Sequence, residues 1–292
     1  MSAGHHEIPV FDLGPTLLFC PTDRPERYAK AAERADALIL DLEDAVAPAE
    51  KPTAREHVAA HLSGLSSQEH HTLRHRTVVR VNPVSSEDFT HDVEMLAGSG
   101  VEFVMLAKAQ GRSDVETVAD ALPGVGILAL CETAAGVTRA EEIAAHPATT
   151  ALMWGAEDLI ASIGGTSSRG SSGIYRDVAR VSRAQVLLAA ATHGKAGIDS
   201  IYADIADTEG LSREAADAVG SGWAAKACIH PSQVPVIRSA YSPGAEELEH
   251  ARALLAEVPH HGGAFQFRGA MVDGPLILHA ERIIQRAQAT GH

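Results

Sequence analysis

The sequence lacks any apolar run long enough to cross a membrane, and its N-terminus lacks the marks of an export signal. No uninterrupted apolar stretch reaches the roughly 18 residues that a transmembrane helix needs. The opening residues, "MSAGHHEIPVFDLGP", contain neither a basic nor an apolar segment of a signal peptide. Cysteine is scarce too, because three in 292 residues cannot form a disulfide scaffold and fit a reducing compartment. We therefore expect a cytoplasmic protein with no membrane partner.

Positive charge is also in short supply. The chain has 24 Lys and Arg residues against 38 Asp and Glu residues, a formal net charge of −14. A surface this acidic repels phosphate backbones, so we expect no nucleic-acid partner. Any anionic ligand must be held by local basic side chains. Zinc is disfavoured as well, because no cluster of Cys and His has the spacing of zinc ligands.

The sequence does contain a regular series of short, β-forming apolar runs, separated by stretches with helical spacing. Strands that alternate with helices form a parallel sheet, and eight such units fit a closed (β/α)₈ barrel better than an open sheet. Many open sheets have a Gly-rich, phosphate-binding turn after an early strand, and this sequence has none. We predict an α/β fold with a TIM barrel over residues 1–240 and a C-terminal helical extension and lid over 241–292. The runs are 16–20, 37–41, 77–81, 102–107, 126–131, 151–155, 196–202 and 224–229.

Polar residues follow most of these runs, always at the same end. In a TIM barrel the carboxyl ends of the strands meet at one mouth, where the active site lies. We therefore expect the carboxylates that follow "LIL" to line an open mouth rather than to be buried. A single polar end could merely begin a loop, but charged residues at several ends favour a shared site. The polar residues at the ends of the runs are Asp41, Glu43, Asp44, Arg80, Asn82, Lys108, Glu132, Glu157, Asp158 and His230, and Asp199 lies within the seventh run.

Two of these carboxylates are candidates for a metal site. Glu132 in "CET" and Asp158 in "GAED" follow neighbouring strands, and such strands lie only about 4.8 Å apart. Mg²⁺ prefers oxygen ligands and commonly takes one or two carboxylates. Glu132 could instead cap a helix or form a salt bridge, although Thr133 is available as the cap. We predict that Glu132 and Asp158 bind Mg²⁺.

Several motifs occur in an informative order: "LLFCPTDRPERYAKA", "LILDLEDAVAPAEKPTAR", "VVRVNP", "CETAAGV", "GAEDL" and "ACIHPSQV". This order, over residues 14–285, resembles the citrate lyase β-subunit-like (CitE-like) branch of the HpcH/HpaI aldolase superfamily. The resemblance implies a TIM barrel, a homotrimer and a requirement for Mg²⁺. It also implies that the protein makes or breaks a C–C bond between an acyl-CoA and a 2-oxo acid, and some members hydrolyse the thioester.

The resemblance assigns roles to the residues that match its motifs. Glu132 and Asp158 would bind the metal, and Arg80 of "VRVN" would hold the carboxylate and carbonyl of the oxo acid. There are three departures. Thr22 stands where the family often has glycine near the CoA entrance, Ala107 stands where it often has proline, and "AAKACIHP" stands where it has a "GKxAIHP" pattern. The other substrate and CoA contacts that the resemblance implies are Phe19, Cys20, Arg24, Lys30, Glu157, Ile229 and His230.

The acidic cluster after the second run has two interpretations. Asp41 and Asp44 could orient Arg80 or a metal-bound water, which would make both of them part of the catalytic site. Alternatively, Glu43 or Asp44 could pair with Lys51 or Arg55 of the next helix as structural support. We favour the first interpretation. A thioester enolate would also need fixed donors, for which the backbone amides of 155–158 are candidates.

The tail is predicted to form two helices interrupted by "SPG", a mobile Gly-rich segment, and an amphipathic helix that begins near Pro275. A lone aspartate, Asp273 in "VDGP", precedes this last helix, where an aspartate is often only a cap. In the CitE-like branch, the matching aspartate is implied to lie on a lid over a neighbouring subunit's mouth. We predict that Asp273 acts in trans as the acid–base group at the thioester α-carbon.

Together these features predict a Mg²⁺-dependent lyase that cleaves a 3-hydroxyacyl-CoA of the malyl-, citramalyl- or citryl-CoA type, with thioesterase activity as a further option. One alternative is a Mg²⁺-dependent aldolase that acts on free pyruvate without CoA, but "RPERYAK" and "IHPSQ" weigh against it. Another is the β subunit of a citrate lyase complex that acts on an acyl-carrier protein.

Overall fold

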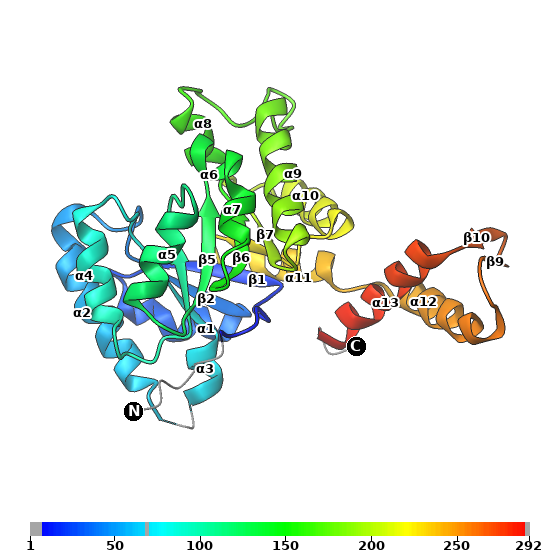
Figure 1. Ribbon diagram of the computed structural model, residues 1–292, viewed down its shortest axis with the longest axis horizontal. Coiled ribbons are helices and arrows are strands. Elements are labelled where there is room, and N and C mark those ends of the chain that lie inside the picture. The colour runs from blue at the N-terminus through cyan, green and yellow to red at the C-terminus, as the bar shows by residue number, and fades with distance from the viewer. Residues whose placement is uncertain (1–7, 68–69, 290–292) are drawn as a thin grey trace. The chain divides into compact units, whose positions relative to one another are not determined.

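The strands close into a parallel barrel in the computed structural model, which describes residues 8–67 and 70–289. β1 pairs with both β2 and β8, which completes the ring. Each predicted run contains or overlaps one observed strand, so the TIM-barrel prediction is confirmed (Figure 1). The strands are β1 (Thr16–Pro21), β2 (Ala37–Asp41), β3 (Thr77–Val81), β4 (Phe103–Leu106), β5 (Gly126–Cys131), β6 (Thr149–Trp154), β7 (Ala196–Asp199) and β8 (Ala225–Cys228).

Helices surround these strands and connect each to the next (Figure 1). Several begin at side-chain caps: the oxygens of Ser86, Thr133 and Asp207 accept backbone N–H groups at the starts of α4, α6 and α10. No helix in the described ranges is long and apolar enough to span a bilayer. The helices are α1 (Tyr28–Arg34), α2 (Lys51–Gly64), α3 (His71–His75), α4 (Glu87–Leu96), α5 (Arg112–Ala121), α6 (Ala134–Thr138), α7 (Ala140–Ala144), α8 (Ala156–Ser162), α9 (Asp177–Thr192), α10 (Thr208–Ser221) and α11 (Gln233–Tyr241).

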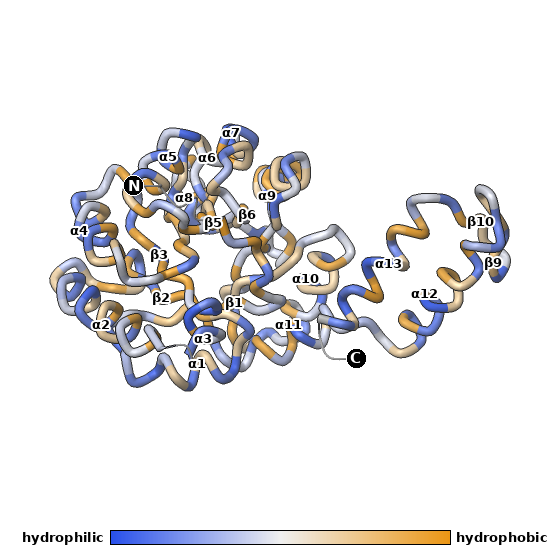
Figure 2. Tube along the Cα trace, turned by 60° about the horizontal axis from the view of Figure 1, so that its bottom comes forward, coloured by the Kyte–Doolittle hydropathy of each residue, from blue (hydrophilic) through white to orange (hydrophobic). Residues whose placement is uncertain are grey.

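The barrel interior is a packed apolar core, and Figure 2 shows apolar residues along strands such as β2 and β3. Phe103 is fully buried, and burying a side chain of this size stabilises a fold by about 1.5–3 kcal/mol. β5 begins with Gly126 because a Cβ at this position would lie 2.9 Å from the Phe103 ring. The members of this core include Leu17, Ile39, Val78, Phe103, Met105, Leu128, Leu130, Met153 and Ile198.

A second compact unit begins at Arg238, within α11, and the predicted boundary after residue 240 falls inside the same helix. This C-terminal unit contains α12 (Ala245–Glu257), β9 (Phe265–Phe267), β10 (Ala270–Val272) and α13 (Gly274–Ala289). Its own apolar cluster joins both helices to the strands, through Ala251, Leu254, Phe265, Val272 and Ala280.

The β9–β10 hairpin is an element that the sequence analysis missed, since it placed a Gly-rich mobile segment here. Arg268 and Gly269 form its two-residue turn with φ values of 47° and 85°. Positive φ at both positions is the geometry that matches the twist of a hairpin. The usual sequence signal of such a turn is Asn-Gly or Asp-Gly. Here the first position is Arg268, so the sequence does not show the signal.

Candidate active site

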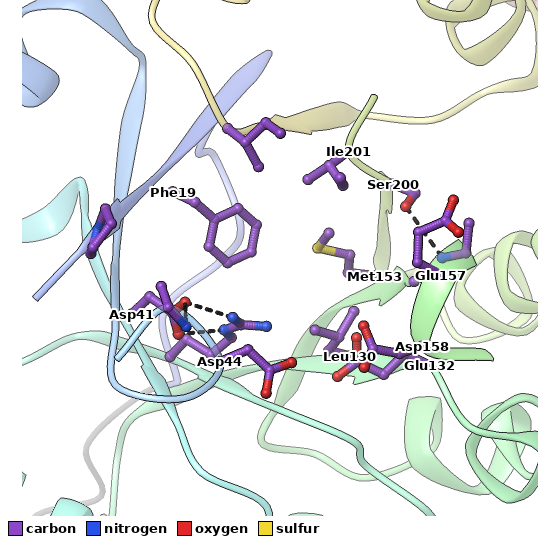
Figure 3. A pocket seen from close by; sticks show the side chains of 16 residues that line it. Phe19, Asp41, Asp44, Leu130, Glu132, Met153, Glu157, Asp158, Ser200 and Ile201 are labelled. Carbon is purple, nitrogen blue, oxygen red and sulfur yellow. Dashed lines mark hydrogen bonds and ion pairs between the residues drawn. The ribbon is translucent and has the colours of Figure 1, made fainter. Parts of the chain in front are cut away.

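A pocket of about 410 Å³ lies at the carboxyl ends of the barrel strands. In Figure 3, the side chains of Asp44, Glu132 and Asp158 lie on one side, and Phe19 and Ile201 lie across from them. The three acidic side chains therefore face Phe19 and Ile201 across the pocket, with Leu130 beside the acids and Ser200 beside Ile201. Its lining consists of Phe19, Pro21, Asp41, Asp44, Ala45, Arg80, Leu130, Glu132, Met153, Gly155, Ala156, Glu157, Asp158, Ser200, Ile201 and Ile229.

Glu132 and Asp158 form an acidic pair in this pocket. Glu132 follows β5 and is 3 % exposed, whereas Asp158 lies in the first turn of α8. Burial, together with the negative charge of Asp158, raises the pKa of Glu132 to about 8. Gly155 permits the close packing, because a Cβ there would lie 2.7 Å from Glu132 Oε2. A carboxylate whose ionisation is opposed by a neighbouring carboxylate in this way forms, with that neighbour, a natural site for a cation.

Glu132 does not serve as a helix cap. The hydroxyl of Thr133 takes that role, accepting the N–H of Gly136 at 3.0 Å. Within the described residues, no group of three or more His, Cys, Asp and Glu side chains is arranged to hold a metal. A pair of carboxylates still fits Mg²⁺, which keeps several waters and needs only one or two protein oxygens.

Arg80, on β3, is held by the acidic cluster after β2. Its Nε and Nη2 donate to the two oxygens of Asp41 at 2.6 Å each. Its Nη1 lies 3.0 Å from Glu43 Oε2, and its guanidinium lies 4.9 Å from the centre of the Phe19 ring. Burial alone would lower the pKa of Arg80. The charges of Asp41 and Glu43 outweigh burial, so the pKa of Arg80 is raised above its ordinary value. Arg80 is thus a fixed, fully charged fork at the pocket wall.

The expectation that the carboxylates after "LIL" are not buried is wrong for two of them. Asp41 is 1 % exposed and Glu43 is 4 % exposed. They tolerate burial because Arg80 and Lys108 neutralise them, and because Asp41 also accepts the N–H groups of Glu43 and Ala45. Asp44 does lie open, with a side chain that is 58 % exposed.

The alternative partners for the acidic cluster are engaged elsewhere. Lys51 lies 3.5 Å from Asp88, and Arg55 pairs with Asp88 and Asp92. These pairs join α2 to α4 away from the pocket lining. Asp41 instead contacts Arg80, which is the partner that the first interpretation expects, and no pairing of Glu43 or Asp44 with α2 is present among the described contacts.

Lys108 is a site residue that the sequence analysis did not select, although it was among the residues that follow the strands. Its ammonium bonds to Glu43, and it lies 3.3 Å from Asp44 Oδ2 and 3.6 Å from Asp158 Oδ1. Its backbone N–H donates to Glu132 Oε1 at 3.1 Å. Burial raises the pKa of Asp44, but Lys108 outweighs burial and the net pKa is lowered.

The residues assigned to acyl-CoA are not all in the pocket. Phe19 and Ile229 line it, but Cys20 is buried and lies outside the lining, because successive side chains on β1 face opposite ways. Burial raises the pKa of Cys20 to about 11, which fits a packed thiol. Arg24, Lys30 and His230 are exposed at the surface.

Two further side chains shape the rim. Glu157 lines the pocket and accepts a hydrogen bond of 2.5 Å from the hydroxyl of Ser168. Thr22, the departure from the family glycine, is buried and donates to the carbonyl of Asp41 at 2.6 Å. Thr22 therefore ties the end of β1 to the residue that holds Arg80, rather than intruding on the pocket.

Two of the predicted enolate donors are used within the protein. The Gly155 amide donates to the Cys131 carbonyl at 3.4 Å, and the Ala156 amide donates to Ser200 Oγ at the same distance. Asp273 lies in the C-terminal unit, directly before α13, where its carbonyl accepts the N–H of Ile277 at 3.1 Å. The residue as a whole is half-buried.

Comparison with known proteins gives consistent results. The HpcH/HpaI aldolase/citrate lyase family matches residues 15–231. A citrate lyase subunit beta-like protein of Mycobacterium tuberculosis is 49 % identical over 274 residues, or 94 % of this chain and 96 % of that protein. A (3S)-malyl-CoA thioesterase of Cereibacter sphaeroides is 33 % identical over 279 residues, or 94 % of each chain. A crystal structure of CitE from M. tuberculosis with magnesium, acetoacetate and coenzyme A has a TM-score of 0.86 at 47 % identity, over 95 % of this chain and 99 % of that one.

Proposed function

The chain belongs to the HpcH/HpaI aldolase/citrate lyase family, and we propose that it is a Mg²⁺-dependent lyase that cleaves a 3-hydroxyacyl-CoA into acetyl-CoA and a 2-oxo acid. The observation that carries this proposal is that two groups of side chains line the same pocket. One is the acidic pair of Glu132 and Asp158, and the other is the guanidinium of Arg80 fixed by Asp41. The first suits a hard cation and the second suits a carboxylate.

Glu132 and Asp158 would hold the ion, which when bound polarises the hydroxyl of the substrate and the carbonyl that forms from it. Arg80 would bind the carboxylate of the same substrate fragment. Its position would be set by Asp41, which leaves the planar group little freedom to turn. Orientation of this kind removes part of the entropic cost of reaching the transition state.

Cleavage is a retro-Claisen reaction whose atoms balance without a further reactant. The hydroxyl gives up its proton to solvent, and the bond between its carbon and the α-carbon breaks. The electron pair of that bond passes to the thioester as an enolate. Asp273 would then donate a proton to the α-carbon, which completes acetyl-CoA, and in condensation it would remove that proton.

CoA would enter past Phe19 and Ile229, which line the pocket. Arg24 and Lys30 are exposed and would attract the CoA phosphates locally, against the net negative charge of the protein. We place His230 at the same entrance and assign Cys20 a packing role behind Phe19. The working unit is proposed to be a homotrimer in the cytoplasm.

The Asp273→Asn variant should lose about 10²–10⁴-fold in turnover, because a positioned acid–base group contributes about that much. If Asp273 acts in trans, subunit exchange with the inactive Glu132→Gln variant should restore part of the activity. Some sites in the mixed trimers would then combine an intact metal site with an intact neighbouring Asp273. Turnover of the exchanged mixture is the measurement, and each variant alone is the control.

Two outcomes would contradict this role. Full activity of Asp273→Asn alone would show that the aspartate only begins α13. Loss of activity without recovery in mixtures, with exchange confirmed by mass spectrometry, would place its action within its own subunit.

The function itself is tested by incubating the purified protein with Mg²⁺ and malyl-, citramalyl- or citryl-CoA. Oxo acid and free thiol are assayed separately, because a lyase releases the oxo acid and keeps the thioester. Thiol release without oxo acid would favour the second candidate, a thioesterase, which the similarity to a (3S)-malyl-CoA thioesterase supports. If no CoA ester reacts, turnover of free pyruvate would favour the aldolase, and turnover of only an acyl-carrier protein ester would favour the citrate lyase complex.

A further inference from the structure

We propose that Lys108 is a positioning residue whose ammonium acts as a built-in counter-cation of the acidic pair and sets how tightly Mg²⁺ binds. It touches both proposed ligands by different groups. The backbone N–H fixes Glu132 Oε1 at 3.1 Å, and the ammonium lies 3.6 Å from Asp158 Oδ1. One residue at the end of β4 thus connects the carboxylates that follow β5 and β6.

The backbone of Lys108 is held in an unusual conformation for this purpose. Its φ of 48° lies in the left-handed region, which non-glycine residues rarely adopt and which clusters at functional sites. The same conformation brings the N–H to Glu132 while the side chain reaches Glu43, Asp44 and Asp158. A lysine placed only for a surface salt bridge would not need this conformation.

The local charges explain why the ammonium matters. Arg80 is bonded to Asp41 and Glu43, whereas the Lys108 ammonium is the cationic group that lies beside Asp158. Among the side-chain pairs that the structure describes, Asp44 and Asp158 have the Lys108 ammonium as their cationic partner. Glu132 lies close enough to feel the positive charges of both Arg80 and Lys108. The Lys108 ammonium keeps these groups assembled without metal, and it also repels a second cation placed between Glu132 and Asp158.

Removing the charge should therefore tighten Mg²⁺ binding. A univalent and a divalent cation within about 5 Å repel each other enough, even with solvent screening, to change the dissociation constant about tenfold or more. The inference rests on the proposed function only for the metal site, and it requires no particular substrate.

The test is calorimetric titration of MgCl₂ into the substrate-free protein at pH 9. Lys108→Met and Lys108→Gln should each bind Mg²⁺ at least about tenfold more tightly than the wild type, while Lys108→Arg should match it. Lys195→Met is the matched charge control, since Lys195 directly precedes β7 at the opposite end of the barrel, and it should leave the affinity unchanged. Equal or weaker binding by a folded Lys108→Gln variant would overturn the inference.

The wild type offers a second measurement should the neutral variants fold poorly. The chain has only five lysines, so lysine labelled with ¹³C at Cε gives a simple spectrum, in which Lys108→Arg identifies the signal of Lys108. Addition of MgCl₂ should shift that signal and leave the Lys195 signal in place. An unmoved Lys108 signal at saturating Mg²⁺ would overturn the inference. If the wild type shows no Mg²⁺ binding that Glu132→Gln abolishes, the proposed metal site itself is wrong and the inference falls with it.

Discussion

The Glu132→Gln variant is expected to lose Mg²⁺-dependent turnover and yet to be more stable than the wild type without metal above pH 8. Turnover should fall to the background rate, because the amide removes one of the two charged oxygens that would hold the ion. The amide is nearly isosteric and can still accept the N–H of Lys108, so the local packing is preserved. Loss of activity would then not reflect loss of structure.

The stability gain follows from the pKa of Glu132, which rises from its ordinary 4.5 to about 8 through burial and the charge of Asp158. Between these values the unfolded chain has released the proton while the folded chain retains it, so stability falls as the pH rises. The loss is complete above about pH 8 and is on the order of a few kcal/mol. The amide side chain of the variant carries no ionisable proton and would escape this loss.

Thermal melts in EDTA at pH 5 and pH 9 provide the measurement. The melting temperatures of Glu132→Gln and the wild type should agree at pH 5, where both side chains are neutral in the fold, and should separate at pH 9. Glu209→Gln is the matched control, because that carboxylate on α10 is 90 % exposed and should change neither profile. A Glu132→Gln protein that melts below the wild type at pH 9, or that retains turnover with Mg²⁺, would refute the account.

Much of the barrel could be predicted because its strands are buried on both faces and therefore read as continuous apolar runs. The polar residues after these runs also placed Arg80, Glu132 and Asp158 at one mouth, since the ends of parallel barrel strands must converge. Neither step needs knowledge of any particular side-chain contact. Both depend only on the period and length of the runs, which the chain itself displays.

The errors lie where a side chain's state depends on partners from other strands. Asp41 ends β2 and Glu43 follows it, but both are buried because Arg80 on β3 and Lys108 after β4 neutralise them. A single run of sequence does not show such a pairing. The left-handed φ of Lys108 and the β9–β10 turn at Arg268 are similar cases, because positive φ at a non-glycine residue is imposed by surrounding contacts rather than by local propensity.

The Arg80→Lys variant is expected to lose about 100-fold in kcat/KM although it keeps the positive charge. The guanidinium engages both oxygens of Asp41 at 2.6 Å and has a third nitrogen 3.0 Å from Glu43. A lysine ammonium is a point charge that cannot make this planar set of contacts and face a substrate carboxylate at the same time. Removing one fixed donor from an oxyanion site costs about 10²–10³ in rate, and the lower end applies because some charge remains.

Arg76, one residue before β3, offers a control. It also uses its guanidinium as a fork, donating to the carbonyls of Asp36, Ala32 and Ala35, but at the amino end of the strand. Arg76→Lys should therefore lower the melting temperature while leaving kcat/KM of the folded enzyme unchanged. Arg80→Lys should instead act mainly on kcat/KM. Steady-state kinetics with the best ester from the thioester screen, together with melts of both variants, separate the two effects. If Arg80→Lys keeps the wild-type kcat/KM, then Arg80 serves only to neutralise Asp41 and Glu43, and carboxylate binding must be assigned elsewhere in the pocket.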